Sequence, residues 1–363
     1  MEIKIIFESI VQECILRNYS DIHLNSFHKP YIRNISGEIE NIENLIINGE
    51  TIETPILTKE NIIEIIKLIG TDTLLIKFES IFELDLSYNF HDNTRFRVNC
   101  YADSNGFSIA MRKIPSEVPT LEEIGLGDNV KQMCQKSKGL ILMTGPTGCG
   151  KSTNLAAMIN YINDNFKKHI ITIEDPIEFL IKSKQSLVNQ REIGNSTHSF
   201  SNAIRACLRE DPNVIMVGEM RDAETIKAVI TLAETGHLVL STLHTNDSVQ
   251  SIDRIIDVFP TGQQDQIKMQ LAMSLIGIIS QRLLPKIDNS GRIAAREVMV
   301  NNDAIRNLII SGKTHQLYSV LEIGQREGMI LMDKYLLALY NKGIISKDIL
   351  RSYARDKDNI DLI

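Results

Sequence analysis

The chain has 363 residues, which is long enough for two domains that each bury a core of their own. Its hydrophobic content of 43% and charged content of 23% exclude a disordered or fibrous chain and indicate a globular protein. The net charge of −7 argues against a broad nucleic-acid-binding surface, so we expect no nucleic-acid partner.

The sequence gives no indication of export, of a membrane span or of a zinc site. No run of about 18 apolar residues is present, and the first residues lack the charge layout and cleavage site of a signal peptide. The five cysteines are scattered without a C-x-x-C pair, so we expect reduced thiols. These features together favour a cytoplasmic protein.

Residues 1–113 are expected to form a small domain of helices and strands. Apolar positions recur with helical spacing over residues 3–16, whereas residues 20–24 and 30–33 have the pattern of short strands. Thr58 is typical of a helix cap and precedes an isoleucine-rich helix. The mixture predicts an α+β domain.

Two strands with a period of two follow in the same domain. In residues 95–100 this period puts Arg95 and Arg97 on the face opposite the apolar side chains. Arg112 lies on the next strand, after a turn at residues 103–106, and also faces away from its apolar neighbours. Three arginines can therefore gather on one sheet face, which is either a solvated surface or a clamp for an anion.

Residues 114–127 hold two prolines and two glycines, a composition typical of a linker, and we place a domain boundary there. Beyond it strands and helices alternate, which predicts a mostly parallel sheet covered on both faces. This α/β domain is expected over residues 128–300, and a helical C-terminal region over residues 301–363. The candidate strands are residues 139–144, 169–174, 214–217 and 238–241.

The most informative motif is G-x-x-x-x-G-K-[ST] at residues 145–152, a phosphate-binding loop between a predicted strand and a predicted helix. Its glycines let backbone N–H groups close on an anion, to which the helix N-terminus adds a partial positive charge. We expect Lys151 to reach the β- and γ-phosphates of ATP and the Ser152 hydroxyl to hold Mg²⁺. An ordinary glycine-rich turn is the alternative. The expected nucleotide-binding residues are Gly145, Pro146, Thr147, Gly148, Cys149, Gly150, Lys151, Ser152 and Thr153.

Acidic residues stand where two of the predicted strands end. Glu174 closes the strand at residues 169–174, and Glu219 follows the strand at residues 214–217. Because open α/β sheets bind ligands at the carboxyl ends of their strands, we expect a catalytic role for at least one of them. Glu219 is expected to hold Mg²⁺ or its waters.

Two histidines flank the strand at residues 238–241. His237 opens it, and His244 follows its end. The spacing, with no cysteine or carboxylate nearby, is a poor metal-binding pattern. His244 is placed to hydrogen-bond a γ-phosphate, although a purely structural histidine fits the same spacing.

Taken together, these motifs resemble the four signature boxes of secretion ATPases of the type II/type IV pilus superfamily, and most closely those of its pilus-retraction branch, the twitching-motility ATPases. The boxes are the phosphate-binding loop and the segments 172–179, 209–222 and 235–245. Segments 20–24 and 95–99 are similar to the PAS-like N-terminal domain of that superfamily. Segment 304–309 is similar to a C-terminal motif of the retraction branch, and Gly328-Met329 with Met332-Asp333 fits the helix that follows it.

This resemblance implies an α/β fold, namely a RecA-like P-loop NTPase domain with a smaller α+β PAS-like N-terminal domain and a helical C-terminal tail. It further implies a homohexameric ring that uses ATP and Mg²⁺. By position, Glu174 would be the general base and Glu219 the Walker B glutamate, while His237 and His244 would form the histidine box. The expected catalytic residues are these four and Lys151. The arginines expected to contact nucleotide phosphates are Arg95, Arg97 and Arg112.

The function implied is a motor that hydrolyses ATP to depolymerise a pilus, peripheral to the inner face of the cytoplasmic membrane and working on an inner-membrane platform protein. Two alternatives stay open. One is an ATPase of pilus or pseudopilus assembly, type II secretion or competence. The other is a nucleotide-gated scaffold without turnover.

Cys149 departs from the superfamily pattern, in which serine usually occupies this loop position. A thiol beside helix N-terminal amides is expected to be unusually acidic. The resulting hypothesis is that alkylation of Cys149 blocks ATP hydrolysis and that bound nucleotide protects it.

Overall fold

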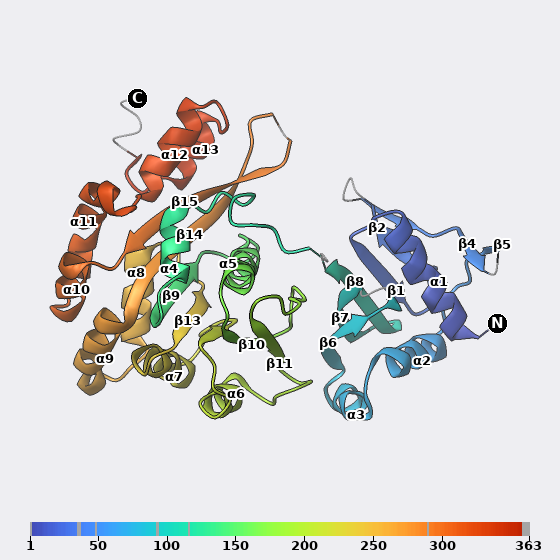
Figure 1. The fold of residues 1–363 in the computed structure, drawn as a ribbon. Helices are drawn as coiled ribbons and strands as arrows, with labels where there is room; N and C mark the ends of the chain where they lie inside the picture. Colours follow the sequence, from blue (N-terminus) through green and yellow to red (C-terminus); the bar gives the residue numbers. More distant parts are fainter. Residues whose placement is uncertain are drawn as a thin grey trace. The chain divides into compact units, whose positions relative to one another are not determined.

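The structure, a computed structural model, describes residues 2–34, 38–47, 49–91, 94–114, 117–288 and 290–357. The chain divides into two compact units (Figure 1), which are Met1–Glu117 with Glu178–Leu180 and Val118–Ile177 with Ile181–Ile363. The division falls inside the predicted linker at residues 114–127. Leu121 and Leu126 of that segment are nevertheless buried in the core of the second unit, because they are apolar side chains beside an apolar sheet face.

The first unit contains a six-stranded antiparallel sheet in the order β3-β2-β1-β8-β7-β6, and a separate hairpin of β4 and β5. Its elements are α1 (Ile3–Leu16), β1 (Asp21–Asn25), β2 (Tyr31–Arg33), β3 (Ile39–Asn41), β4 (Asn44–Ile47), β5 (Glu50–Glu53), α2 (Lys59–Ile69), α3 (Asp72–Ile81), β6 (Glu83–Asn89), β7 (Arg95–Asp103) and β8 (Gly106–Ile114).

One face of this sheet is apolar and packs against the helices. Alternate residues of its strands, such as Ile22, Val98 and Ile109, join the buried face of α1 in a single core. The predicted cap of α2 is confirmed, since the Thr58 side chain accepts from the backbone N–H of Asn61 in a reciprocal capping box.

The second unit contains a seven-stranded sheet in the order β11-β10-β12-β13-β9-β14-β15, in which neighbouring strands are parallel except the last pair. The predicted α/β architecture is confirmed. The elements are α4 (Asp128–Cys134), β9 (Gly139–Thr144), α5 (Lys151–Asn165), β10 (His169–Glu174), β11 (Leu187–Glu192), α6 (Phe200–Cys207), β12 (Val214–Val217), α7 (Ala223–Glu234), β13 (Leu238–Leu243), α8 (Ser248–Asp257), α9 (Thr261–Ser274), β14 (Leu275–Pro285) and β15 (Arg292–Val300).

Helices cover both faces of this sheet, as expected for buried parallel strands. Leu140 and Leu142 of β9 join the core formed with α6 to α9, whereas Ile141 and Met143 join the core formed with α4 and α5. The described residues after residue 300 are mainly helical, as predicted. They form α10 (Asp303–Ile310), α11 (Leu317–Ile323), α12 (Met332–Asn341) and α13 (Lys347–Tyr353), with short 3-10 segments at Thr314–Gln316 and Gly324–Glu327.

No helix among the described residues combines the length and the apolar character that a membrane span requires.

Candidate active site

The carboxyl ends of β10, β12, β13 and β9 meet at one edge of the large sheet, because these strands are parallel and adjacent. The register pairs Ile173 with Val217, and Leu243 with Thr144. Consequently the chain segments that leave these strands carry Glu174, Glu219, His244 and the loop 145–150 to the same edge. This is the position at which open α/β sheets bind ligands.

The loop 145–150 depends on glycine at three places. Gly145, Gly148 and Gly150 have positive φ angles of 143°, 74° and 89°, which side chains rarely tolerate. A Cβ atom on Gly145 would also overlap the carbonyl oxygen of Gln281 and Sγ of Cys149. The helix α5 begins directly after the loop, so its free N–H groups face the space that the loop encloses.

Lys151 is the first residue of α5 and is buried. Its ammonium donates to the backbone carbonyls of Gly145 and Pro146 at 2.9 and 3.0 Å. The cation is therefore held at the mouth of the loop, next to the helix N-terminus, where two sources of positive potential coincide.

His244 links the loop to Glu219. Its Nδ1 lies 3.5 Å from the Thr147 hydroxyl, and its Nε2 lies 3.6 Å from a carboxylate oxygen of Glu219. Partial desolvation, and then the nearby ammonium of Lys151, lower the pKa of His244 below its ordinary value, although about half of its side chain, 49%, is exposed. The ring is thus neutral at pH 7, and an Nε2–H directed at Glu219 leaves Nδ1 as an acceptor for Thr147. Arg221 forms an ion pair with the other oxygen of Glu219 at 2.5 Å.

Glu174 ends β10 with a buried side chain. One of its carboxylate oxygens accepts from the Thr172 hydroxyl at 2.6 Å and from the Gln190 amide at 3.1 Å. The chain leaving β12 passes directly beside it, because the N–H of Gly218 donates to the carbonyl of Ile173 at 2.8 Å. Glu174 and Glu219 therefore lie at the carboxyl ends of neighbouring parallel strands, at the same edge of the sheet.

Two residues of β11 that the sequence analysis did not single out complete this edge. Gln190 orients Glu174, and the buried Glu192 accepts from the backbone N–H of Ile177 at 3.0 Å, which holds the loop after β10. The polar sequence of β11 carries no strand pattern, so neither residue could be placed without the structure.

His237 is not brought to this edge within the described chain. It stands before the first residue of β13, at the opposite end of the sheet, where its carbonyl accepts from the N–H of Gly139 and its own N–H donates to the carbonyl of Leu232 in α7. A six-residue strand, about 20 Å long, separates it from His244. The histidine ring lies instead 3.0 Å from the carbonyl of Leu232. The two histidines therefore do not form one cluster in this chain.

The structure also corrects the expected chemistry of Cys149. Only 3% of this residue is exposed. Burial raises the pKa of the Cys149 thiol above its ordinary value, and the Lys151 ammonium and nearby backbone N–H groups offset this only in part. The thiol is therefore not acidic, because it points into the protein rather than toward the anion side of the loop.

The three arginines of the first unit differ in exposure. Arg95 is buried and donates to the Ser87 hydroxyl at 2.6 Å. Arg97 is exposed and pairs in register with Arg112, whose exposed side chain donates to Asp21 at 2.7 Å. All three arginines thus lie on the same face of the small sheet, where Arg97 and Arg112 are exposed and Arg95 is buried.

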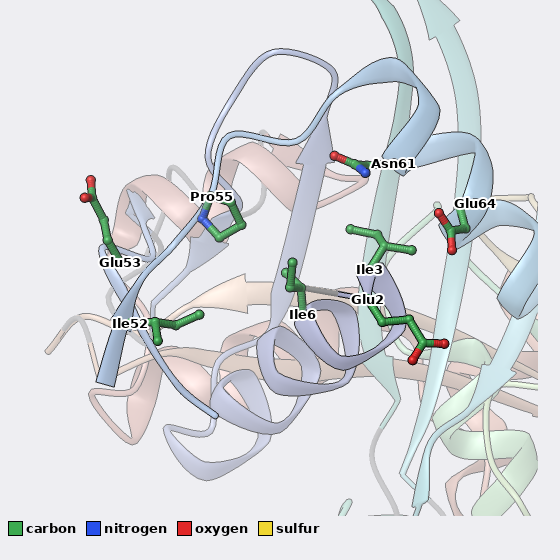
Figure 2. Close-up of a pocket in the computed structure, with 8 residues that line it drawn as sticks. All are labelled: Glu2, Ile3, Ile6, Ile52, Glu53, Pro55, Asn61 and Glu64. Atoms are coloured by element: carbon green, nitrogen blue, oxygen red, sulfur yellow. The ribbon is translucent and has the colours of Figure 1, made fainter. Parts of the chain in front are cut away.

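A pocket of about 490 Å³ in the first unit has the wrong charge for a phosphate ligand. Figure 2 shows isoleucine and glutamate side chains around it, and none of the described residues that line it is cationic. The lining residues come from α1, β5 and α2 and from the segments beside them, and they are Glu2, Ile3, Ile6, Ile52, Glu53, Pro55, Asn61 and Glu64. This pocket is therefore unsuited to a phosphate, unlike the loop at the edge of the large sheet.

Comparison with known proteins identifies the family. The model of the type II/IV secretion system protein family matches residues 1–333. The chain belongs to this family. It is 44% identical to the type IV pilus retraction ATPase PilT of Pseudomonas aeruginosa over 94% of this chain and 95% of the relative. It is also 44% identical to a twitching motility protein of Neisseria gonorrhoeae, over 85% of this chain and 83% of the relative.

A solved structure of another member of the type II/IV secretion family has the same fold. The crystal structure of the pilus retraction motor PilT with bound ADP covers 98% of this chain and 99% of its own, with a TM-score of 0.86 and 40% identity. Family members of this kind are nucleotide-binding ATPases of pilus machinery, and the fold described above is theirs.

Proposed function

We propose that this chain is a Mg²⁺-dependent ATPase motor that powers retraction of a type IV pilus. The proposal is carried by one observation, namely that a phosphate-binding loop and two carboxylates from neighbouring strands leave the same edge of the sheet. The similarity of the chain to pilus retraction ATPases supports pilus retraction as the mechanical task that hydrolysis powers.

In this proposal the loop residues 145–150, with Lys151, Ser152 and Thr153, bind the phosphates of ATP. The positive φ angles of the three glycines permit the backbone to close on an anion, and Lys151 already lies against the loop. On phosphate binding, its ammonium would exchange the carbonyls of Gly145 and Pro146 for phosphate oxygens. This exchange keeps the buried cation hydrogen-bonded in both states.

The residues at the sheet edge fit a magnesium ion in type and number. Mg²⁺ prefers oxygen ligands and commonly takes one or two from the protein, the rest coming from phosphates and water. The Ser152 hydroxyl and the half-buried Glu219 carboxylate would supply them. When bound, the ion neutralises charge that develops on the phosphate oxygens.

Glu174 is proposed as the general base that takes a proton from the attacking water. The hydrogen bonds from Thr172 and Gln190 fix the orientation of this buried carboxylate at the edge of the sheet, and a carboxylate held there is able to accept that proton. His244, between Thr147 and Glu219, is proposed to sense the γ-phosphate by hydrogen bonding to it.

At the level of the assembly we propose a homohexamer at the inner face of the cytoplasmic membrane, acting on a platform protein there. The exposed Arg97 and Arg112 would let the first unit contact nucleotide phosphates. The buried Arg95, which bonds Ser87 on the same sheet face, would support these two side chains. A hinge within residues 114–127 would convert nucleotide binding and release into relative movement of the two units.

At the contact between subunits, Arg205, which is exposed and paired with Glu224, would face the neighbouring subunit.

The first prediction concerns Glu174→Gln. Removal of the base should lower phosphate release by about a hundredfold or more, because general-base catalysis contributes that order, while ATP binding persists. Glu234→Gln is the matched control, since it removes an exposed carboxylate at the end of α7, away from the phosphate-binding loop, and should leave turnover intact. Phosphate release and nucleotide affinity are measured on assembled protein. Absence of turnover in the wild type would favour a nucleotide-gated scaffold.

A further inference from the structure

A buried amide lies directly beneath the phosphate-binding loop. Gln281 belongs to β14, the strand beside β9, and only 3% of it is exposed. Its Nε2 donates to the backbone carbonyl of Cys149 at 2.5 Å. Its Oε1 accepts from the Asn154 amide of α5 at 2.8 Å and from Nε of Arg296 at 2.6 Å.

The chemistry of these partners fixes the orientation of the Gln281 amide. A guanidinium can only donate, so the oxygen of the amide must face Arg296 and the NH₂ group must face the loop. A flipped amide would oppose donor to donor on one side and acceptor to acceptor on the other. The carbonyl of Cys149 is thereby held toward the protein interior.

Planarity of the peptide bond extends this constraint to the anion side of the loop. In a trans peptide the C=O and the following N–H point in opposite directions. When the Cys149 carbonyl points inward to Gln281, the N–H of Gly150 points outward to the open side of the loop. The contact is close, because a Cβ atom on Gly150 would lie 3.0 Å from Nε2 of Gln281.

Arg296 connects this amide to a third part of the chain. It lies opposite Gln281 in the β14–β15 register and is 4% exposed. Besides Gln281, its guanidinium donates to the backbone carbonyls of Gly125 at 3.1 Å and Ile124 at 2.5 Å. The planar guanidinium of Arg296 thus donates to three acceptors in a fixed geometry, which the ammonium of a lysine cannot reproduce.

We propose that Gln281 is a positioning residue for nucleotide binding, which holds the Cys149–Gly150 peptide with its N–H toward the phosphate, and that Arg296 couples this peptide to the segment Ile124–Gly125. The inference rests on the proposed function to the extent that the anion is the phosphate of a nucleotide. It makes the segment before α4 part of the nucleotide response, because any movement of Gly125 acts on Arg296 and through Gln281 on the loop.

The variant Gln281→Glu separates positioning from folding. The carboxylate keeps an acceptor for Arg296 and Asn154 and gains an ion pair, so the fold is retained. The donor to the Cys149 carbonyl is replaced by an oxygen, which repels that carbonyl and turns the peptide. We expect ADP affinity to fall about ten- to hundredfold, the cost of a buried acceptor left unpaired.

The matched control is Asn163→Asp, which exchanges another buried amide for a carboxylate, in helix α5 at the end far from the loop. Asn163 donates to the carbonyl of Lys182, far from the loop, so ADP affinity should stay at the wild-type value. Affinity is measured by calorimetry and folding by thermal unfolding. A variant that does not unfold cooperatively is replaced by Gln281→Met, which lacks the donor but matches the length.

The coupling to Ile124–Gly125 is tested with Arg296→Lys by hydrogen exchange of residues 121–127, with and without ADP. We expect ADP to slow exchange there in the wild type and to have no such effect in the variant. The proposal is overturned by wild-type ADP affinity in folded Gln281→Glu, by an equal loss in Asn163→Asp, or by unchanged ADP protection in Arg296→Lys. Failure of the wild type to bind ADP would instead refute the proposed function.

Discussion

At the scale of single residues, His244 joins two parts of the site that come from different strands. Because partial desolvation and Lys151 lower its pKa, the folded state binds fewer protons at His244 than the unfolded state does. The stability that this residue contributes is complete above its ordinary pKa of about 6.5 and is lost as the pH falls toward the folded-state value. His23, whose pKa burial also lowers, acts in the same direction.

We therefore expect the free energy of unfolding to decrease between pH 7.5 and pH 5.5 less steeply in His244→Gln than in the wild type. Urea titrations of the nucleotide-free protein at several pH values measure this difference. His315→Gln, at an exposed histidine outside the site, is the control and should retain the wild-type dependence. Equal pH dependence in His244→Gln and the wild type would show that His244 is not held neutral.

Cys149 gives the second residue-scale prediction. Since burial raises the pKa of its thiol, little thiolate is present at pH 7.5, and access is restricted. We expect iodoacetamide to modify Cys149 slowly in the folded protein and quickly in urea, with Cys149→Ser close to wild type in ATP hydrolysis. Peptide mass spectrometry follows the modification. Rapid alkylation of the native protein would restore the original hypothesis of an acidic thiol.

At the scale of elements, the turn from β9 into α5 depends on Gly145. Its φ of 143° and the overlap that a Cβ would make with Gln281 and Cys149 both oppose alanine. Gly145→Ala should lower stability by about 1–3 kcal/mol and abolish nucleotide binding. Gly236→Ala is the control, because Gly236 also has positive φ but has no atom within 4 Å of its Cβ position. It should lose stability and keep affinity, as measured by urea unfolding and calorimetry.

The elements that could be predicted from the sequence are those with a regular apolar pattern. The strands β9, β10, β12 and β13 are continuous apolar runs, so the sheet edge and its two carboxylates followed from them. The strand β14 was not predicted, because the buried polar residues Ser280 and Gln281 interrupt its apolar pattern. Ser280 hydrogen-bonds the Thr144 hydroxyl at 2.8 Å, so these interruptions are contacts with the loop and its strand.

The low acidity of Cys149 and the distance between His237 and His244 escaped the sequence for a different reason. Both depend on what surrounds a residue in three dimensions, namely the burial of Sγ and the end of the strand at which each histidine lies. A local motif records neither. The resemblance to secretion ATPases, by contrast, rested on whole segments and is confirmed by the family match.

At the scale of the whole molecule, each unit has hydrophobic cores of its own, so each is able to behave as a rigid body. This property suits a motor in which loss of the γ-phosphate changes the arrangement of two lobes. Within the second unit, the buried contacts of Arg296 with Ile124 and Gly125 tie the segment before α4 to the strand beside the phosphate-binding loop.

The central claim is that a triphosphate held at Lys151 drives pilus retraction. Its most direct test is a strain that lacks this chain, complemented with the wild type or with Lys151→Ala, in which surface pili and twitching motility are both measured. The account predicts that Lys151→Ala behaves like the deletion, with excess surface pili and no motility. Normal motility with Lys151→Ala would contradict the role of the loop, and cells without pili would point to assembly instead of retraction.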